Sequence, residues 1–274
     1  MDFGSILKGS REYTFHSHTQ YCDGKAPMEE MARAALEQGF EFYGFSPHSP
    51  IPIASPCNMK ESDVEPYLAE VERIRNLFAG RPIRFFAGME IDYLGEDFGP
   101  SSDFFRSLPL DYSIGSSHFI VNQHGEPVDV DGSFDNFKRK MENLFNRDID
   151  YVVETYFRHT LDMIERGGFD ILGHFEKIGL NAGYYACGIE DGSHYQGLVN
   201  EVIDEIIKRG LTIELNTKAR EKHGRFFPGE RYLPKLVEAG TPILVNSDAH
   251  QPDKIRASRA EAFAILDSIA NSVK

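Results

Sequence analysis

Short apolar runs alternate with amphipathic segments along almost the whole chain. In 26–39 and 196–210 apolar residues recur at i, i+3, i+4 and i+7, and Gly39 and Gly210 end these predicted helices. Segments 62–78 and 258–269 have further helical patterns. The strand-like runs lie between them, at 13–18, 42–48, 83–91, 112–119, 169–174, 212–217 and 242–250. This alternation predicts an α/β protein.

Strands that are separated by helices pair in parallel through right-handed crossovers. Seven such units in 274 residues favour a barrel over an open sheet. The longest interruption, 120–150, is a polar loop followed by a charged helix. We expect it to lie as an excursion beside the barrel mouth, so that residues 1–274 form a single domain with no linker.

Composition narrows the class of protein. The formal net charge of −14 argues against a nucleic-acid partner and against an anionic membrane surface. The three cysteines have no paired spacing, which indicates reduced thiols and a cytoplasmic protein. No segment approaches the roughly 20 apolar residues that span a bilayer, and the N-terminus lacks a signal-peptide core. We therefore expect a cytoplasmic protein with a small-molecule partner. The oligomeric state stays open.

Potential metal ligands follow the predicted strands with unusual regularity. Six of the ten histidines lie at or just after the ends of strand-like runs, and acidic or amide side chains occupy the remaining ends. These positions are His16, His18, His48, Glu90, His118, His174, Asn216, Asp248 and His250. Barrel enzymes build their active sites at this C-terminal edge, because the loops there can vary while the barrel supports them.

The spacing of these residues favours a metal centre. His16 and His18 share one face of the first strand, and Asp248 and His250 share one face of the last. Imidazole and carboxylate without thiolate suit zinc, iron or manganese. Six histidines with Asp23, Glu90 and Asp248 exceed the needs of one ion, so Glu90 is the natural bridge between two. Two-metal sites suit phosphoester hydrolysis.

The motifs, in order along the chain, resemble those of the polymerase-and-histidinol-phosphatase (PHP) superfamily, in particular its histidinol-phosphate phosphatase branch. They are FHSHTQYCDGK, FYGFSPHSP, AGMEIDY, DYSIGSSHF, FDILGHFEKI, IELNTKAR and PILVNSDAH. The resemblance implies a distorted seven-stranded (β/α)7 TIM-like barrel with two to three divalent ions. It assigns the ions to three sets: His16, His18, Glu90 and Asp248; Glu90, His118 and His174; and Asp23, His48 and His250.

The resemblance also implies hydrolysis of L-histidinol phosphate in histidine biosynthesis. Its catalytic residues would be Glu90, Asp248 and His250. The chain departs from the branch after His174, where FEKIGLNAGYY offers Lys177 and no arginine. Substrate contacts are therefore expected from Lys177, Asn216, Lys218 and Arg220, with Arg220 carrying more of the phosphate binding than usual in the branch, helped by Lys177.

Several alternatives stay open from the sequence. The substrate could be another small phosphomonoester or a nucleotide, and the domain could be a metal-bound scaffold without catalysis. Asp23 could be only a turn residue before Gly24, and Asn216 only a polar strand end. Asp92 and Glu214 are expected to orient imidazoles rather than bind metal.

Overall fold

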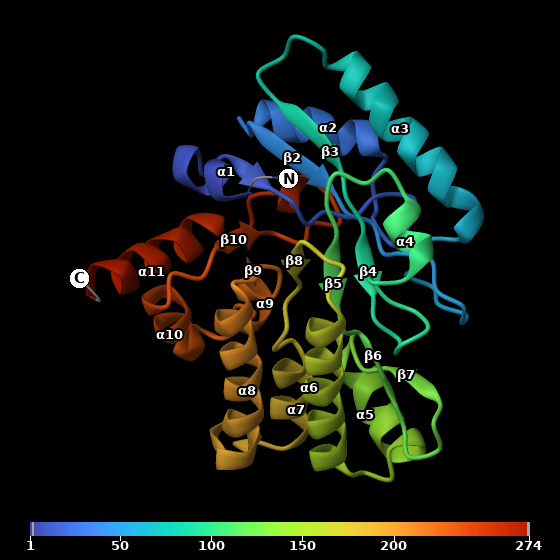
Figure 1. Cartoon of the computed structure of the whole chain (residues 1–274), viewed down its shortest axis with the longest axis vertical. Coiled ribbons are helices and arrows are strands. Elements are labelled where there is room, and N and C mark those ends of the chain that lie inside the picture. The colour runs from blue at the N-terminus through green and yellow to red at the C-terminus, as the bar shows by residue number, and fades with distance from the viewer. Residues whose placement is uncertain (2, 273–274) are drawn as a thin grey trace.

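The computed structural model describes residues 1 and 3–272, and Figure 1 shows its elements. The strands are β1 (Tyr13–Thr14), β2 (Phe42–Phe45), β3 (Arg84–Ala87), β4 (Glu90–Asp92), β5 (Ile114–Ser116), β6 (Phe119–Val121), β7 (Pro127–Asp129), β8 (Ile171–Leu172), β9 (Thr212–Asn216) and β10 (Ile243–Asn246). The helices are α1 (Phe3–Gly9), α2 (Met28–Glu37), α3 (Val64–Leu77), α4 (Asp103–Ser107), α5 (Phe134–Leu144), α6 (Ile149–Arg166), α7 (Ile178–Tyr185), α8 (Ser193–Arg209), α9 (Arg220–His223), α10 (Leu233–Glu238) and α11 (Arg259–Ser272).

The parallel strands form a distorted ring. They make two sheets in the orders β1-β2-β3 and β10-β9-β8-β5-β4. Two isolated parallel bridges join the sheets, one between His48 and Glu90 and one between Ser17 and Ala249. The His18 amide donates to the Ala249 carbonyl at 2.8 Å, next to the second bridge. Since β3 and β4 both come from the predicted strand 83–91, the ring has the seven positions that the sequence predicts.

An aromatic core fills the ring and explains part of its distortion. The Tyr112 hydroxyl donates to the Phe15 carbonyl at 2.6 Å. A Cβ at Gly44 would lie 2.2 Å from that hydroxyl, and one at Gly88 would lie 2.1 Å from the Tyr112 ring. Glycine is therefore required at both positions to leave room for the Tyr112 side chain. Gly88 lies between β3 and β4, so Tyr112 packs where the predicted strand divides.

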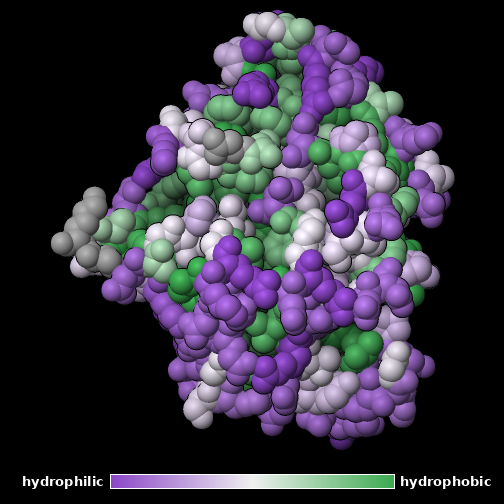
Figure 2. Space-filling model, viewed as in Figure 1, coloured by the Kyte–Doolittle hydropathy of each residue, from purple (hydrophilic) through white to green (hydrophobic). Residues whose placement is uncertain are grey.

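Helices bury the outer faces of the strands. Residues of α6 and α8 pack in one large apolar cluster with β9, and residues of α2 and α3 pack in another with β2 and β3. Figure 1 shows α5 to α8 gathered beyond β5, β8 and β9. Hydrophilic residues cover most of these helices on the face that Figure 2 shows. Within the described part of the chain, no helix is both long enough and apolar enough to cross a membrane.

The predicted helices are confirmed with small changes at their ends, but three details of the strands and of 120–150 were wrong. The runs 83–91 and 112–119 each contain two strands instead of one. The polar part of 120–150 belongs to an antiparallel hairpin of β6 and β7, not to a plain loop. Its turn forms because the Asn122 side chain accepts from the His124 and Glu126 amides at 2.9 Å and Gly125 adopts a φ of 80°. The charged helix predicted there is α5.

Candidate metal centre

The nine predicted ligands converge at one end of the barrel. Eight of them follow β1, β2, β5, β8 and β10, whereas Glu90 is the first residue of β4. The sequence had placed Glu90 at the end of a strand, and the break after β3 brings it to the same edge. Each ligand lies within 4 Å of at least one other through nitrogen and oxygen atoms.

Glu90 occupies the centre of this cluster. Its Oε2 lies 3.1 Å from His16 Nε2 and 3.0 Å from His48 Nδ1, and its Oε1 lies 2.9 Å from His174 Nε2. The side chain is fully buried. Burial alone would raise the pKa of Glu90, but the surrounding imidazoles hold that pKa well below its usual value. Glu90 is therefore a carboxylate that several cations can share.

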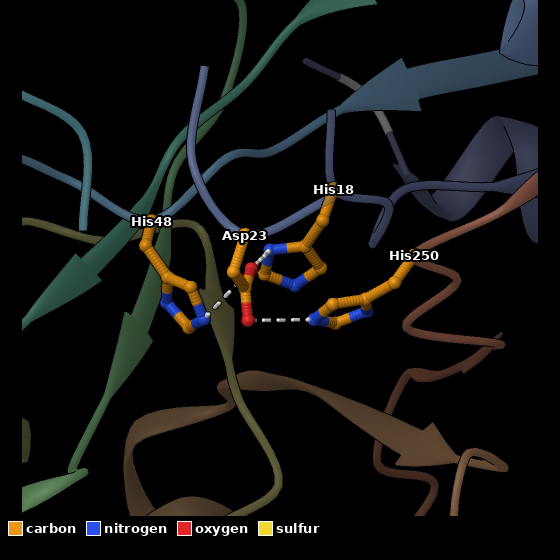
Figure 3. A group of neighbouring side chains, drawn as sticks. All are labelled: His18, Asp23, His48 and His250. Atoms are coloured by element: carbon orange, nitrogen blue, oxygen red, sulfur yellow. Dashed lines mark ion pairs between the residues drawn. The ribbon is translucent and has the colours of Figure 1, made fainter. Parts of the chain in front are cut away.

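A second group of ligands surrounds Asp23, as Figure 3 shows. Asp23 Oδ2 lies 3.2 Å from His250 Nε2, and Asp23 Oδ1 lies 3.5 Å from His18 Nδ1 and 3.9 Å from His48 Nε2. Asp23 lies within a tight turn that closes at Gly24, since a Cβ at Gly24 would lie 2.3 Å from the backbone nitrogen of Thr19. The turn and ligand interpretations of Asp23 are thus compatible, because the turn points this carboxylate at the histidines.

The donor atoms fit divalent cations. Buried polar atoms normally make well-directed hydrogen bonds, yet several in this cluster make none, although nitrogen and oxygen atoms face one another at close range. They include His16 Nε2, His18 Nε2, Asp23 Oδ1, His48 Nδ1 and Glu90 Oε2. Four groups of three or four ligands each have their donor atoms within 4.8 Å of one another, and these groups share members. Nitrogen and oxygen donors in overlapping groups match zinc, iron or manganese in a centre of more than one ion.

Cys22 lies beside this centre without joining these groups. Its Sγ is 3.4 Å from His18 Nδ1. Burial raises the pKa of the Cys22 thiol to about 12, which favours the protonated form. The groups of converging donors contain only histidines and carboxylates, so nitrogen and oxygen are the donors that this site offers.

Glu214 orients the first histidine from behind. His16 Nδ1 donates to Glu214 Oε2 at 2.9 Å, so that His16 Nε2 faces Glu90. The buried Glu214 carboxylate also accepts from the side-chain amides of Asn216 at 3.0 Å and Asn246 at 3.1 Å. Metal-binding histidines typically donate their second nitrogen to such a carboxylate. The predicted orienting position of Glu214 agrees with these contacts, whereas the sequence analysis overlooked Asn246.

Replacement of Glu214 by glutamine should weaken zinc binding about 10- to 100-fold, because the carboxylate then no longer fixes and polarises His16. Competition between the protein and a chromogenic zinc chelator measures this affinity. Glu126→Gln in the hairpin is the control and should bind zinc as the wild type does. Equal zinc affinity in Glu214→Gln and the wild type would show that Glu214 does not support the centre.

Asp92 orients His118, which follows β5, in the same way. His118 Nδ1 donates to Asp92 Oδ1 at 2.7 Å, and the Asn58 side chain donates to Asp92 Oδ2 at 2.6 Å. Asn58 comes from the 49–60 loop, which the sequence analysis did not connect with the site. Asp92 is therefore placed to orient His118 rather than to bind metal.

Three lysines, Lys177, Lys218 and Lys222, line the cavities beside the cluster, and the first two pair with buried or partly buried carboxylates near it. A cavity of about 180 Å³ reaches His48, His118 and Lys218, and it shares Lys218 with a neighbouring cavity of about 530 Å³ that Lys177 also lines. Lys218 Nζ lies 3.1 Å from Asp248 Oδ1. Lys177 pairs with Asp131 at 2.8 Å. Burial opposes the charge of Lys177, but the carboxylates of Asp131, Asp248 and Glu90 outweigh it and raise the Lys177 pKa.

Arg220 is not brought to the cluster. Its guanidinium donates to Glu261 at 3.0 Å and to Glu230 at 2.8 Å, and it stacks on the Phe226 ring at 4.8 Å. Arg220 lines neither of the two cavities beside the cluster. Carboxylates of Glu230 and Glu261 hold its donors away from the cluster, and a role of Arg220 in phosphate binding stays a prediction.

Asn216 is also engaged within the protein. Its amide nitrogen donates to Glu214 and, at 3.1 Å, to Asp248 Oδ2, and its oxygen accepts from the Lys218 amide at 3.0 Å. These contacts place Asn216 behind Asp248. We therefore expect it to position Asp248 rather than to contact substrate.

The fold and this cluster of potential metal ligands are typical of metal-dependent hydrolases, and comparison with known proteins identifies the family. The family model of the PHP domain matches residues 14–218, and the chain belongs to that family. The relative named "Probable histidinol-phosphatase" from Deinococcus radiodurans is 28% identical over 258 residues, which cover 90% of this chain and 89% of that protein.

Two solved structures share the fold. HisK of Listeria monocytogenes has a TM-score of 0.80 at 21% identity, with 91% of this chain and 99% of that chain covered. Histidinol phosphate phosphatase of Lactococcus lactis, solved with zinc, L-histidinol and phosphate, has a TM-score of 0.75 at 16% identity, with 94% of each chain covered. The predicted α/β barrel of the PHP type is confirmed.

Proposed function

We propose that this chain is a metal-dependent phosphomonoesterase whose substrate is L-histidinol phosphate. The observation that carries the proposal is the convergence of nine imidazole and carboxylate side chains beside cavities whose lining includes Lys177 and Lys218. The name of the Deinococcus radiodurans relative and the ligands of the Lactococcus lactis structure support the choice of substrate.

The proposed reaction divides between the metals and the side chains. When bound, divalent ions lower the pKa of a water molecule and neutralise phosphoryl oxygens. Glu90 and Asp248 would hold the ions between them, and the His250 imidazole would complete the group around Asp23. His250 Nδ1 donates to the Asp248 carbonyl at 3.0 Å, which turns His250 Nε2 towards Asp23.

The two lysines would act on the phosphoryl group itself. Negative charge builds on its oxygens as the water oxygen bonds to phosphorus and the ester P–O bond breaks. The positive charges of Lys177 and Lys218 would stabilise those oxygens. The alcohol then leaves with a proton, and the larger cavity provides room for it beside the cluster.

Steady-state kinetics on the zinc- or manganese-loaded protein tests this proposal. We expect kcat/KM for L-histidinol phosphate to exceed that for p-nitrophenyl phosphate and for a nucleoside monophosphate by about tenfold or more. A higher value for one of the other esters would assign the site to another small phosphomonoester. No hydrolysis of any ester by folded, metal-loaded protein would favour a non-catalytic scaffold.

The net charge and the cysteines support a prediction of the partners and the cell compartment. The net charge of −14 disfavours nucleic acid as a partner. Cys22, Cys57 and Cys187 are free thiols, which suits a reducing compartment. We infer a cytoplasmic enzyme that acts on a small phosphate ester.

A further inference from the structure

Buried Glu176 pairs with partly buried Arg225 beside the larger cavity, outside the metal cluster, and Arg225 also pairs with Glu190 at 3.0 Å. Glu176 is fully buried just after His174. Both of its carboxylate oxygens accept from Arg225 Nη2 at 2.9 Å. They also accept from the Tyr195 hydroxyl at 2.6 Å and from the Gly229 amide at 3.0 Å. The Glu176 carboxylate is therefore fully hydrogen-bonded inside the protein.

This pair joins two segments that both contribute residues to the wall of the larger cavity. Glu176 lies two residues before α7, which gives Leu180, Asn181 and Tyr184 to the cavity wall. Arg225 belongs to the 224–229 segment, and its guanidinium lies 5.2 Å above the ring of Phe227, another wall residue. A change in the pair would therefore alter the width of the cavity.

Each end of the pair is also coupled to the metal cluster. Lys177 follows Glu176 directly in the chain and lines the cavity. Phe227 exchanges two backbone hydrogen bonds with Asn216, at 2.8 and 3.1 Å. The Asn216 side chain in turn donates to Asp248. Both members of the pair are therefore connected, through the chain or through hydrogen bonds, to residues that line the cavity or contact Asp248.

A glycine leaves the space for this arrangement. A Cβ at Gly179 would lie 2.3 Å from Glu176 Oε1, 2.4 Å from the Tyr195 hydroxyl and 2.9 Å from Arg225 Nη2. Any larger residue would displace the carboxylate that holds Arg225 in place. Gly179 therefore belongs to the same arrangement.

We propose that the Glu176–Arg225 pair is a positioning device for the substrate cavity, which holds the 224–229 segment against the start of α7 so that the cavity fits the alcohol part of the substrate. Buried ion pairs contribute little net stability, because the loss of hydration offsets their attraction. The contribution that we propose for this pair is therefore to fix the position of the 224–229 segment relative to α7. The proposal rests on the phosphatase function proposed above.

Binding of two probes separates positioning from plain stability. L-histidinol probes the cavity, and inorganic phosphate probes the metal side, so calorimetry on the zinc-loaded protein measures each affinity without turnover. In Glu176→Gln we expect the Kd of L-histidinol to rise about tenfold, with a matching rise in KM for L-histidinol phosphate. The Kd of phosphate should change less than about twofold.

The double variant Glu176→Met with Arg225→Met keeps the test valid if the single variant folds poorly. Apolar replacement of both partners often preserves stability. We therefore expect a Tm near that of the wild type together with the same loss of L-histidinol affinity. Gly179→Ala should weaken L-histidinol binding in the same direction. Arg231→Ala is the control, because Arg231 pairs with the exposed Asp191. The Arg231→Ala protein should bind both probes with wild-type affinity.

Wild-type L-histidinol affinity in the stable double variant would overturn the positioning proposal while leaving the phosphatase function in place. An equal loss of both affinities in step with Tm would reduce the pair to a structural role and also overturn the proposal. A wild-type protein that hydrolyses no phosphomonoester would instead refute the phosphatase function, and this proposal with it.

Discussion

Replacing Glu90 with glutamine should lower kcat about 10³-fold or more and should reduce the number of bound ions. The carboxylate touches histidines of three different strands, and a neutral amide offers only one oxygen and no negative charge to cations on its two sides. Phosphate release and elemental analysis on the same preparation measure both effects. Glutamine preserves the shape of the side chain, so that packing changes little.

Ser116→Ala provides the matched control for this variant. The Ser116 hydroxyl donates to Glu90 Oε1 at 2.8 Å, so its removal takes one neutral donor from the carboxylate and leaves the charge. We expect a loss of less than about tenfold in kcat for this control. If Glu90→Gln retained wild-type kcat and metal content, the bridging role would be wrong.

Lys177→Met should lower kcat/KM about 10- to 150-fold with unchanged metal content, because a charge-assisted contact to a phosphoryl oxygen is worth about 1.5–3 kcal/mol. Methionine retains most of the length of the side chain. Steady-state kinetics on L-histidinol phosphate measures the loss. The sequence predicts a larger role for Arg220 than for Lys177, whereas from the contacts in the structure we expect the reverse order.

Arg220→Ala tests this reversal directly. Its guanidinium is held by Glu230 and Glu261, so we expect kcat/KM within about threefold of the wild type. A large loss in Arg220→Ala combined with none in Lys177→Met would restore the original assignment and move the phosphate position towards α9.

Most of the candidate ligands could be predicted because they follow the ends of parallel strands, whereas Glu90 reaches the same edge through the break after β3. His16 and His18 come just after β1, which is shorter than predicted and ends at Thr14, and parallel strands bring their C-terminal ends to one edge. These local rules do not depend on details of packing. The same reasoning placed Asp92 and Glu214 next to histidines, and the structure puts each within 3 Å of an imidazole nitrogen.

The details that the sequence did not reveal depend on distant partners. Strand 83–91 divides at Gly88, where the ring of Tyr112 packs, and no local pattern announces that contact. The Arg220 side chain turns away because of Glu261, 41 residues further along the chain. Arg225 meets Glu176 across 49 residues. A long arginine side chain can reach several carboxylates, and which of them it contacts depends on the positions that the folded chain gives them.

The most direct test of the metal centre is the release of phosphate from L-histidinol phosphate while chelator-stripped protein is titrated with zinc or manganese. Our account predicts only background release without metal and a rise to a plateau at about two to three ions per chain. The full rate in metal-free protein would contradict it.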